Sequence, residues 1–147
     1  MRQYRAEWVL PISQPPIRDG WVLIDRGRIV AFGPSRAGDL PPSNATDLGQ
    51  VVVLPSLVNA HTHLELSWMK GRLPPTPDFP GWIRGVIALQ RRGATSKEVE
   101  HAAIDTAIAE ARATGTHLIG DVSNTLSSVA PLLAANGPAV VFHELIG

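Results

Sequence analysis

VVVLPSLVNAHTH, residues 51–63, is the stretch that decides the fold and the chemistry of this chain. Residues 51–54 are wholly apolar, Pro55 ends that run, and residues 57–60 lead directly into His61-Thr62-His63. Side chains at positions i and i+2 of a strand project to the same side, so both imidazoles can converge on one cation, at about 2.0–2.1 Å each for zinc. The stretch predicts a buried strand whose carboxyl end carries two metal ligands, His61 and His63.

A purely structural histidine pair is the alternative to a metal site. The chain has five histidines in 147 residues, and at that frequency chance gives roughly 0.2 His-x-His pairs. The position of the pair favours the metal site, because barrel and open-sheet enzymes have their active sites at the carboxyl ends of strands.

Downstream of the pair, strands and helices alternate. A proline-rich loop covers residues 73–80, and Thr95 with Glu98 forms a plausible capping box for the second of three helices. Repeated βα units predict a parallel sheet, either an open one or a barrel. The apolar strands of this region are expected to be buried on both faces. The expected elements are helix 82–92, helix 95–114, strand 116–121, helix 127–136 and strand 139–143.

Upstream, residues 1–54 contain β-rich runs and turn residues. Strands are expected at 4–10, 20–25 and 28–33, and Gly27 supplies the positive φ of a tight hairpin turn. The stretch 34–47 is rich in proline, glycine, serine and asparagine and predicts a loop.

Three further polar residues follow predicted strands. Asp121 ends strand 116–121, and His143 and Glu144 end strand 139–143. Parallel strands bring their carboxyl ends together, so these side chains are expected to face the same pocket as the histidine pair. For Asp121, a helix or turn cap is an equal alternative. His101 and His117 lack this placement and are expected to be structural.

Composition excludes several classes of function. The formal net charge is zero, with 13 basic and 13 acidic residues, so no basic surface is expected to attract nucleic acid or an anionic membrane. The absence of cysteine excludes disulfides and thiolate metal sites. The polar N-terminus lacks an apolar signal region, and no stretch reaches the roughly 18 apolar residues of a bilayer span. A cytoplasmic protein with a small-molecule substrate is expected, and homo-oligomerisation stays open.

Residues 53–67, VLPSLVNAHTHLELS, resemble the signature of the amidohydrolase superfamily. The likeness extends to its aminohydrolase branch, with cytosine deaminase, the chlorohydrolases and aminodeoxyfutalosine deaminase, and covers almost the whole chain. It implies an α/β fold: the first part of a (β/α)8 TIM-type barrel, preceded by a small N-terminal β-sandwich half-domain. The domains would be residues 1–54 and residues 55–147, the latter being the first three βα units. Ser56 departs from the family pattern, which usually has glycine there.

The resemblance also implies roles for individual residues. His61 and His63 would bind a divalent metal, with zinc expected and iron or manganese as alternatives. Glu65 would lie in the substrate pocket, faced by His143 or Glu144, and Asp121 is the remaining candidate there. The family's other metal ligands and its acid/base residue come from later strands, so no catalytic residue is assigned in these 147 residues. A whole barrel takes about 250 residues, and the chain alone is expected to be an inactive, truncated piece.

The expected reaction is metal-dependent hydrolysis of a C–N bond, with hydrolytic deamination of an amino-substituted heterocycle or nucleoside favoured. Within enzymes, the alternative is a cyclic amide hydrolase of the imidazolonepropionase type. Glu65 stands where an arginine would indicate carboxylate substrates of the dihydroorotase kind, which favours a deaminase. The non-enzymatic alternative is a truncated product that acts as a binding or assembly module.

Overall fold

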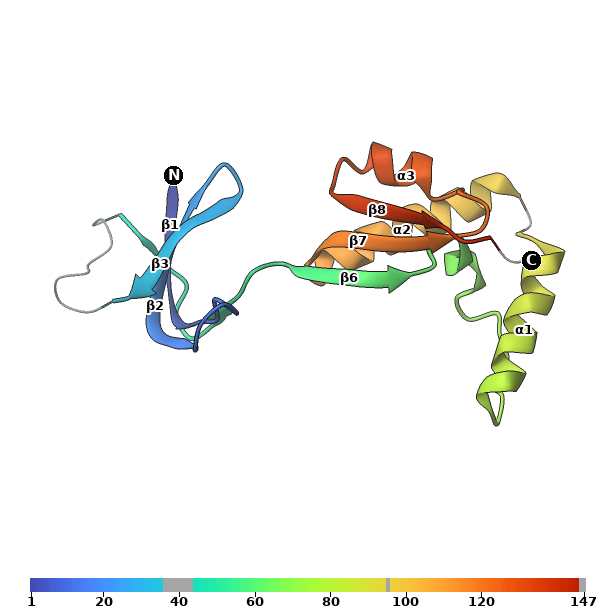
Figure 1. Ribbon diagram of the computed structural model, residues 1–147, viewed down its shortest axis with the longest axis horizontal. Coiled ribbons are helices and arrows are strands. Elements are labelled where there is room, and N and C mark those ends of the chain that lie inside the picture. Colours follow the sequence, from blue (N-terminus) through green and yellow to red (C-terminus); the bar gives the residue numbers. More distant parts are fainter. Residues whose placement is uncertain (36–43, 95, 146–147) are drawn as a thin grey trace. The chain divides into compact units, whose positions relative to one another are not determined.

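The computed structural model describes residues 1–35, 44–94 and 96–145, and the chain divides into two compact units, Met1–Pro55 and Ser56–Gly147. Each unit is built around a sheet of its own (Figure 1). Among the described residues, no helix is long and apolar enough to cross a bilayer.

The described residues of the first unit form strands and no helix. The unit is built on one antiparallel meander, in which β1 pairs with β2 and β2 pairs with β3. Two short strands, β4 and β5, pair in parallel with β1. The strands are β1 (Arg2–Val9), β2 (Ile17–Asp25), β3 (Arg28–Pro34), β4 (Thr46–Asp47) and β5 (Val52–Val53). Residues 36–43 of the predicted loop lie outside the described residues, and its last two residues form β4.

The predicted hairpin between β2 and β3 is confirmed. Arg26 and Gly27 both have positive φ, 48° and 76°, which is the backbone of the tight turn whose twist matches that of the flanking strands. Ala6, Val9 and Val22 are buried and form the apolar interior of this unit.

The second unit alternates strands with helices, as predicted. Its three strands are parallel, in the order β6-β7-β8. The short 3-10 helix η1, directly after the histidine pair, was not predicted. The elements are β6 (Leu57–Thr62), η1 (Leu64–Met69), α1 (Phe79–Arg92), α2 (Lys97–Ala113), β7 (Thr116–Ser123), α3 (Val129–Ala134) and β8 (Ala139–His143).

The core of the second unit lies between the sheet and its helices. Ile119 of β7 packs with Ile104 and Ile108 of α2 and with Leu132 of α3, and all four side chains are at most 6% exposed. Val99 at the start of α2 is 37% exposed, whereas Ile104 is fully buried, so α2 contacts the sheet mainly through Ile104 and Ile108.

The prediction that the strands of this sheet are buried on both faces is wrong for the described structure. Val58 in β6 is 59% exposed, and Val140 and Phe142 in β8 are 48% and 53% exposed. The register places these residues on the face opposite Ile119. Helices pack over the Ile119 face, so alternate side chains of the same apolar strands stay open to solvent.

Helices α1 and α2 begin at polar caps. The Asp78 carboxylate accepts a hydrogen bond from the Gly81 N–H at 2.6 Å, and the Ser96 hydroxyl accepts one from the Val99 N–H at 3.3 Å. Ser96 thus occupies the N-cap position of α2, and Thr95, the expected cap, lies outside the described residues.

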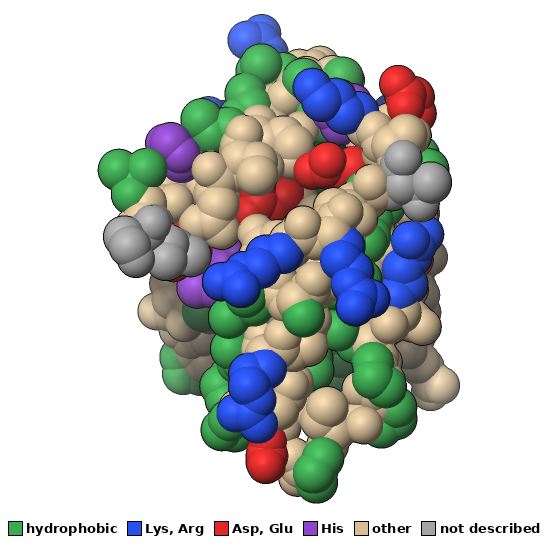
Figure 2. All heavy atoms as spheres, turned by 90° about the vertical axis from the view of Figure 1, so that its right-hand side faces the viewer, with side chains coloured by type: hydrophobic (Ala, Val, Ile, Leu, Met, Phe, Trp, Pro, Cys, Tyr) green, Lys and Arg blue, Asp and Glu red, His purple; other side chains and the backbone are tan. Residues whose placement is uncertain are grey.

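Helix α1 buries one side only. Val86 is buried, whereas Ile87 is 43% exposed. Figure 2 shows basic and hydrophobic side chains sharing the face on which α1 lies. The exposed residues of α1 include Phe79, Trp82, Arg84, Arg91 and Arg92.

Gly120 is needed where β7 passes β6. A Cβ atom at Gly120 would lie 2.8 Å from the carbonyl oxygen of Ala60, the residue before His61. We expect Gly120→Ala to lower the free energy of unfolding by about 1–3 kcal/mol, since backbone must move. Urea unfolding followed by circular dichroism measures this change.

Gly85 provides the matched control for this substitution. It lies in α1, where an added Cβ would make ordinary contact with Leu73 at 3.4 Å. Gly85→Ala should be neutral or stabilise by up to about 1 kcal/mol. Equal stability of Gly120→Ala and the unmodified chain would show that the β6–β7 approach is looser than described.

Candidate metal centre

The two histidines lie where β6 passes into η1. His61 lies in β6, one residue before the strand ends. Its N–H donates to the Asn59 side-chain oxygen at 3.2 Å. His63 follows the strand at the N-cap position of η1, with φ −126° and ψ 81°. The Nε2 atoms of the two rings are 3.2 Å apart, and the ring planes are inclined by 69°.

This spacing fits a shared metal ion. Two nitrogens bound to one tetrahedral zinc at 2.0–2.1 Å are about 3.3–3.4 Å apart, close to the 3.2 Å between the Nε2 atoms. Imidazole nitrogens also suit iron and other divalent transition metals. Within the part of the chain that the structure describes, no group of three or more His, Cys, Asp or Glu is placed to hold a metal. The pair therefore offers two candidate ligand nitrogens.

Asp121 is buried beside this segment. Its side chain is 0% exposed. One carboxylate oxygen accepts from the Leu64 N–H at 2.7 Å, and the other accepts from the Ser128 hydroxyl at 2.5 Å. Asp121 thus joins the end of β7 to the residue after His63 and to the start of α3. These two donors occupy both carboxylate oxygens of Asp121.

Glu65 is buried under the loop that follows β7, and its side chain is 3% exposed. Its carboxylate accepts four hydrogen bonds, from the Ser123 hydroxyl, the Asn124 N–H, and the N–H and hydroxyl of Thr125. Burial by itself raises the pKa of Glu65, but these hydrogen bonds favour the charged form and leave the pKa below its ordinary value. The described contacts hold this carboxylate to the loop.

His143 and Glu144 lie at the exposed end of β8 and contact the same loop. The Glu144 N–H donates to the Ser123 carbonyl at 3.0 Å. The Asn124 side-chain amide donates to the Glu144 carbonyl at 2.9 Å, and His143 Nε2 lies 3.2 Å from the Asn124 carbonyl oxygen. The structure thus gathers His143, Glu144 and Glu65 around one loop. His101 and His117 are exposed elsewhere.

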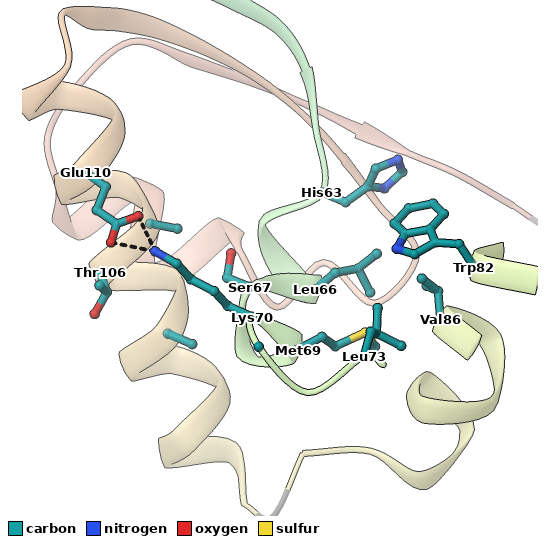
Figure 3. A pocket seen from close by; sticks show the side chains of 13 residues that line it. His63, Leu66, Ser67, Met69, Lys70, Leu73, Trp82, Val86, Thr106 and Glu110 are labelled. Carbon is teal, nitrogen blue, oxygen red and sulfur yellow. Dashed lines mark hydrogen bonds and ion pairs between the residues drawn. The ribbon is translucent and has the colours of Figure 1, made fainter. Parts of the chain in front are cut away.

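A pocket opens beside His63. Its volume is about 650 Å³, and it lies between η1, α1 and α2. Figure 3 shows His63 and Trp82 close together on one side, with the ion pair between Lys70 and Glu110 on the other. The Lys70 ammonium lies 2.9 Å from the nearer Glu110 oxygen. Apolar residues line the pocket between them: Leu66, Met69, Leu73 and Val86.

Sequence reasoning missed two parts of this neighbourhood. Trp82 was expected to form part of a helix and was not linked to the histidines, although it lines the same pocket as His63. Asn124 was not among the predicted site residues. The polar run Ser123-Asn124-Thr125 directly after an apolar strand was the signal available for it.

Comparison with known proteins places this chain in a family. No protein-family model matches the chain. It is 34% identical over 108 residues to the 5-methylthioadenosine/S-adenosylhomocysteine deaminase of Nitratidesulfovibrio vulgaris (strain DP4), an alignment that covers 72% of this chain and 24% of the relative. The chain thus spans about a quarter of the length of that curated relative.

Solved structures match the chain along almost its whole length. The Helicobacter pylori aminofutalosine deaminase, crystallised with methylthio-coformycin, matches with a TM-score of 0.76 and 28% identity, covering 100% of this chain and 36% of that one. The atrazine chlorohydrolase of Arthrobacter aurescens TC1, crystallised with zinc, has the same fold, with a TM-score of 0.70, 18% identity, and coverage of 97% and 35%. The chain belongs to the amidohydrolase superfamily, and its 147 residues match the N-terminal portion of the deaminases and hydrolases of that family.

Proposed function

We propose that this chain supplies the first two metal ligands, His61 and His63, of a hydrolase that deaminates an amino-substituted heterocycle or nucleoside. The observation that carries the proposal is the 3.2 Å separation of the two Nε2 atoms at the carboxyl end of a parallel strand. The deaminases among the relatives support the reaction type.

The metal would be a divalent cation, with zinc favoured and iron or manganese as alternatives. When bound, such an ion polarises water toward hydroxide at neutral pH. Catalytic zinc usually has three protein ligands, and the pair supplies two, so we infer that the remaining ligands and the acid/base residue come from further strands. His61 and His63 must present unprotonated Nε2 atoms, which places the ring proton of each on Nδ1.

The sheet of the second unit is the proposed start of a (β/α)8 barrel, formed by residues 55–147. The exposed apolar face carrying Val58, Val140 and Phe142 supports this, because a barrel interior is filled by branched and bulky side chains from every strand. Residues 1–54 are proposed to be part of a small β-sandwich domain, since β1 to β5 form one open sheet.

The substrate is proposed to bind near His63. Trp82 and the neighbouring apolar side chains of the pocket suit a planar ring, which gains contact with an aromatic face. The exposed His143 and Glu144 are proposed to donate and accept hydrogen bonds with polar groups of the substrate. The relatives' names point to adenosine-like compounds, which combine a planar base with hydroxyl groups.

A non-enzymatic role is the second candidate. It is favoured by the presence of only two grouped ligands within the described residues, together with the open apolar face of the second sheet. An apolar face and exposed strand edges favour association with other chains, so the chain by itself would act as an assembly module. An imidazolonepropionase-type reaction remains the alternative within enzymes.

We expect the native polypeptide that contains these residues to release ammonia from an adenosine-type nucleoside. The intact mass, the metal content and ammonia release are measured on protein purified from its natural source. Stoichiometric zinc, iron or manganese with ammonia release supports the deaminase. Hydrolysis of a cyclic amide without ammonia supports the imidazolonepropionase alternative, and a metal-free, inactive protein of 15.8 kDa supports the assembly module.

A further inference from the structure

Glu65 and its partners connect the metal strand with the next two strands of the sheet. We call residues 124–127, which follow β7, the rim loop. Glu65 lies in η1, two residues after His63, and η1 starts with a backbone bond from the Leu66 N–H to the His63 carbonyl at 3.0 Å. The Glu65 carboxylate then reaches residues that are 58 to 60 positions later in the chain.

The contacts of Glu65 require a group that only accepts hydrogen bonds. Oε1 accepts from the Asn124 N–H at 2.9 Å, and Oε2 accepts from the Thr125 N–H at 3.0 Å. The hydroxyls of Ser123 and Thr125 also donate to Oε2, at 2.7 Å and 2.5 Å. Hydroxyls can turn to accept instead, but backbone N–H groups cannot. A glutamine here must therefore point its amide donors at one of two fixed N–H groups.

The rim loop in turn holds the end of β8. Asn124 is the residue whose N–H is bound by Glu65, and its side-chain amide donates to the carbonyl of Glu144 at 2.9 Å. Its own carbonyl lies 3.2 Å from the His143 ring nitrogen. A displacement of Asn124 would thus shift both exposed polar residues of β8 at once.

We propose that Glu65 is a positioning residue, which fixes His63 relative to the rim loop and to His143 and Glu144. This inference rests on the proposed function of His61 and His63 as metal ligands. It replaces the expectation that Glu65 contacts the substrate, because its carboxylate is buried and fully hydrogen-bonded. Residues behind metal ligands commonly set ligand orientation, and their loss lowers metal affinity.

The test is a Co²⁺ titration of the native polypeptide that contains these residues, followed by the visible absorption of the bound ion. We expect Glu65→Gln to weaken Co²⁺ binding by about 10-fold and to alter the shape of the spectrum, because the histidine pair loses its fixed geometry. Thr125→Val, which removes one hydroxyl donor to Glu65, should weaken binding by a smaller factor and keeps the test valid if Glu65→Gln does not fold.

Two control variants separate positioning from general destabilisation. Glu100 accepts from the Ser127 hydroxyl at 2.6 Å, so Glu100→Gln makes the same charge change at the same loop without touching η1. Ile104→Val removes one methyl group from the core under the sheet. It should lower the unfolding midpoint without altering these polar contacts. Both should bind Co²⁺ within about twofold of the unmodified chain, since neither variant removes a hydrogen bond to the Glu65 carboxylate.

The outcomes distinguish the two proposals. Unaltered Co²⁺ affinity and spectrum in Glu65→Gln and Thr125→Val, with normal binding by the unmodified chain, would overturn the positioning role and leave the metal site standing. Equal weakening in Ile104→Val, at the same loss of stability, would also overturn it. Failure of the unmodified native polypeptide to bind Co²⁺ would overturn the metal site itself, and the positioning role with it.

Discussion

Replacing His63 with asparagine is expected to weaken zinc binding by about 100-fold or more. A neighbour that merely orients a ligand is worth 10–100-fold in affinity, and His63 is proposed to bind the ion directly, with its Nε2 3.2 Å from that of His61. Asparagine is smaller and polar, and His63 is half-exposed, so the fold should persist. Competition titration against a chromophoric zinc chelator measures the affinity.

The exposed histidines provide the control for His63→Asn. His101 lies on α2 and His117 near the start of β7, and both are exposed. His101→Asn and His117→Asn should leave the affinity unchanged. Zinc binding that falls by the same factor in His117→Asn as in His63→Asn would show that the ion binds at scattered surface histidines, and the proposed pair would have to be abandoned.

Most secondary structure of this chain was predictable because its signals are local. Strand 139–143 coincides with β8, and the turn at Arg26 and Gly27 lies where glycine allowed it. Helix 127–136 was predicted two residues too long at each end, since α3 covers Val129–Ala134. Helix ends depend on caps and on packing, which a periodic pattern does not contain.

Burial was less predictable than secondary structure. An apolar run such as Ala139–His143 predicts a strand between two covered faces, yet Val140 and Phe142 are half-exposed here. The side chains that cover a sheet come from other elements. The sequence of the strand itself therefore does not indicate whether those covering side chains are present.

At the candidate site, the sequence indicated which polar residues lie at strand ends better than it indicated what their side chains contact. The spacing of His61 and His63 is a property of one strand, and the 3.2 Å contact follows from it; their role as ligands stays a prediction. Glu65 and Asp121 are different, because their partners lie about 57 to 60 positions away. A carboxylate at a strand end can turn to solvent, to a substrate or to a neighbouring loop, and only the packed structure separates these.

Replacing Asp121 with alanine is expected to lower the free energy of unfolding of the second unit by about 2–4 kcal/mol. Asp121 is fully buried, and its two oxygens accept from the Leu64 N–H and the Ser128 hydroxyl. Alanine removes both acceptors and leaves two buried donors without partners, each of which costs about 1–3 kcal/mol. Urea unfolding, followed by circular dichroism and by tryptophan fluorescence, measures the loss.

Asparagine at the same position tests the proposed cause. Asp121→Asn keeps one oxygen for the Leu64 N–H, and its amide can donate to Ser128, whose hydroxyl can turn to accept. The loss should therefore fall to about 1 kcal/mol. Asp105 on α2 is an exposed aspartate, so Asp105→Ala should change stability by less than about 0.5 kcal/mol. Equal losses in Asp121→Ala and Asp105→Ala would contradict the proposed cause. Burial and the two hydrogen bonds of Asp121 would then contribute nothing measurable to stability.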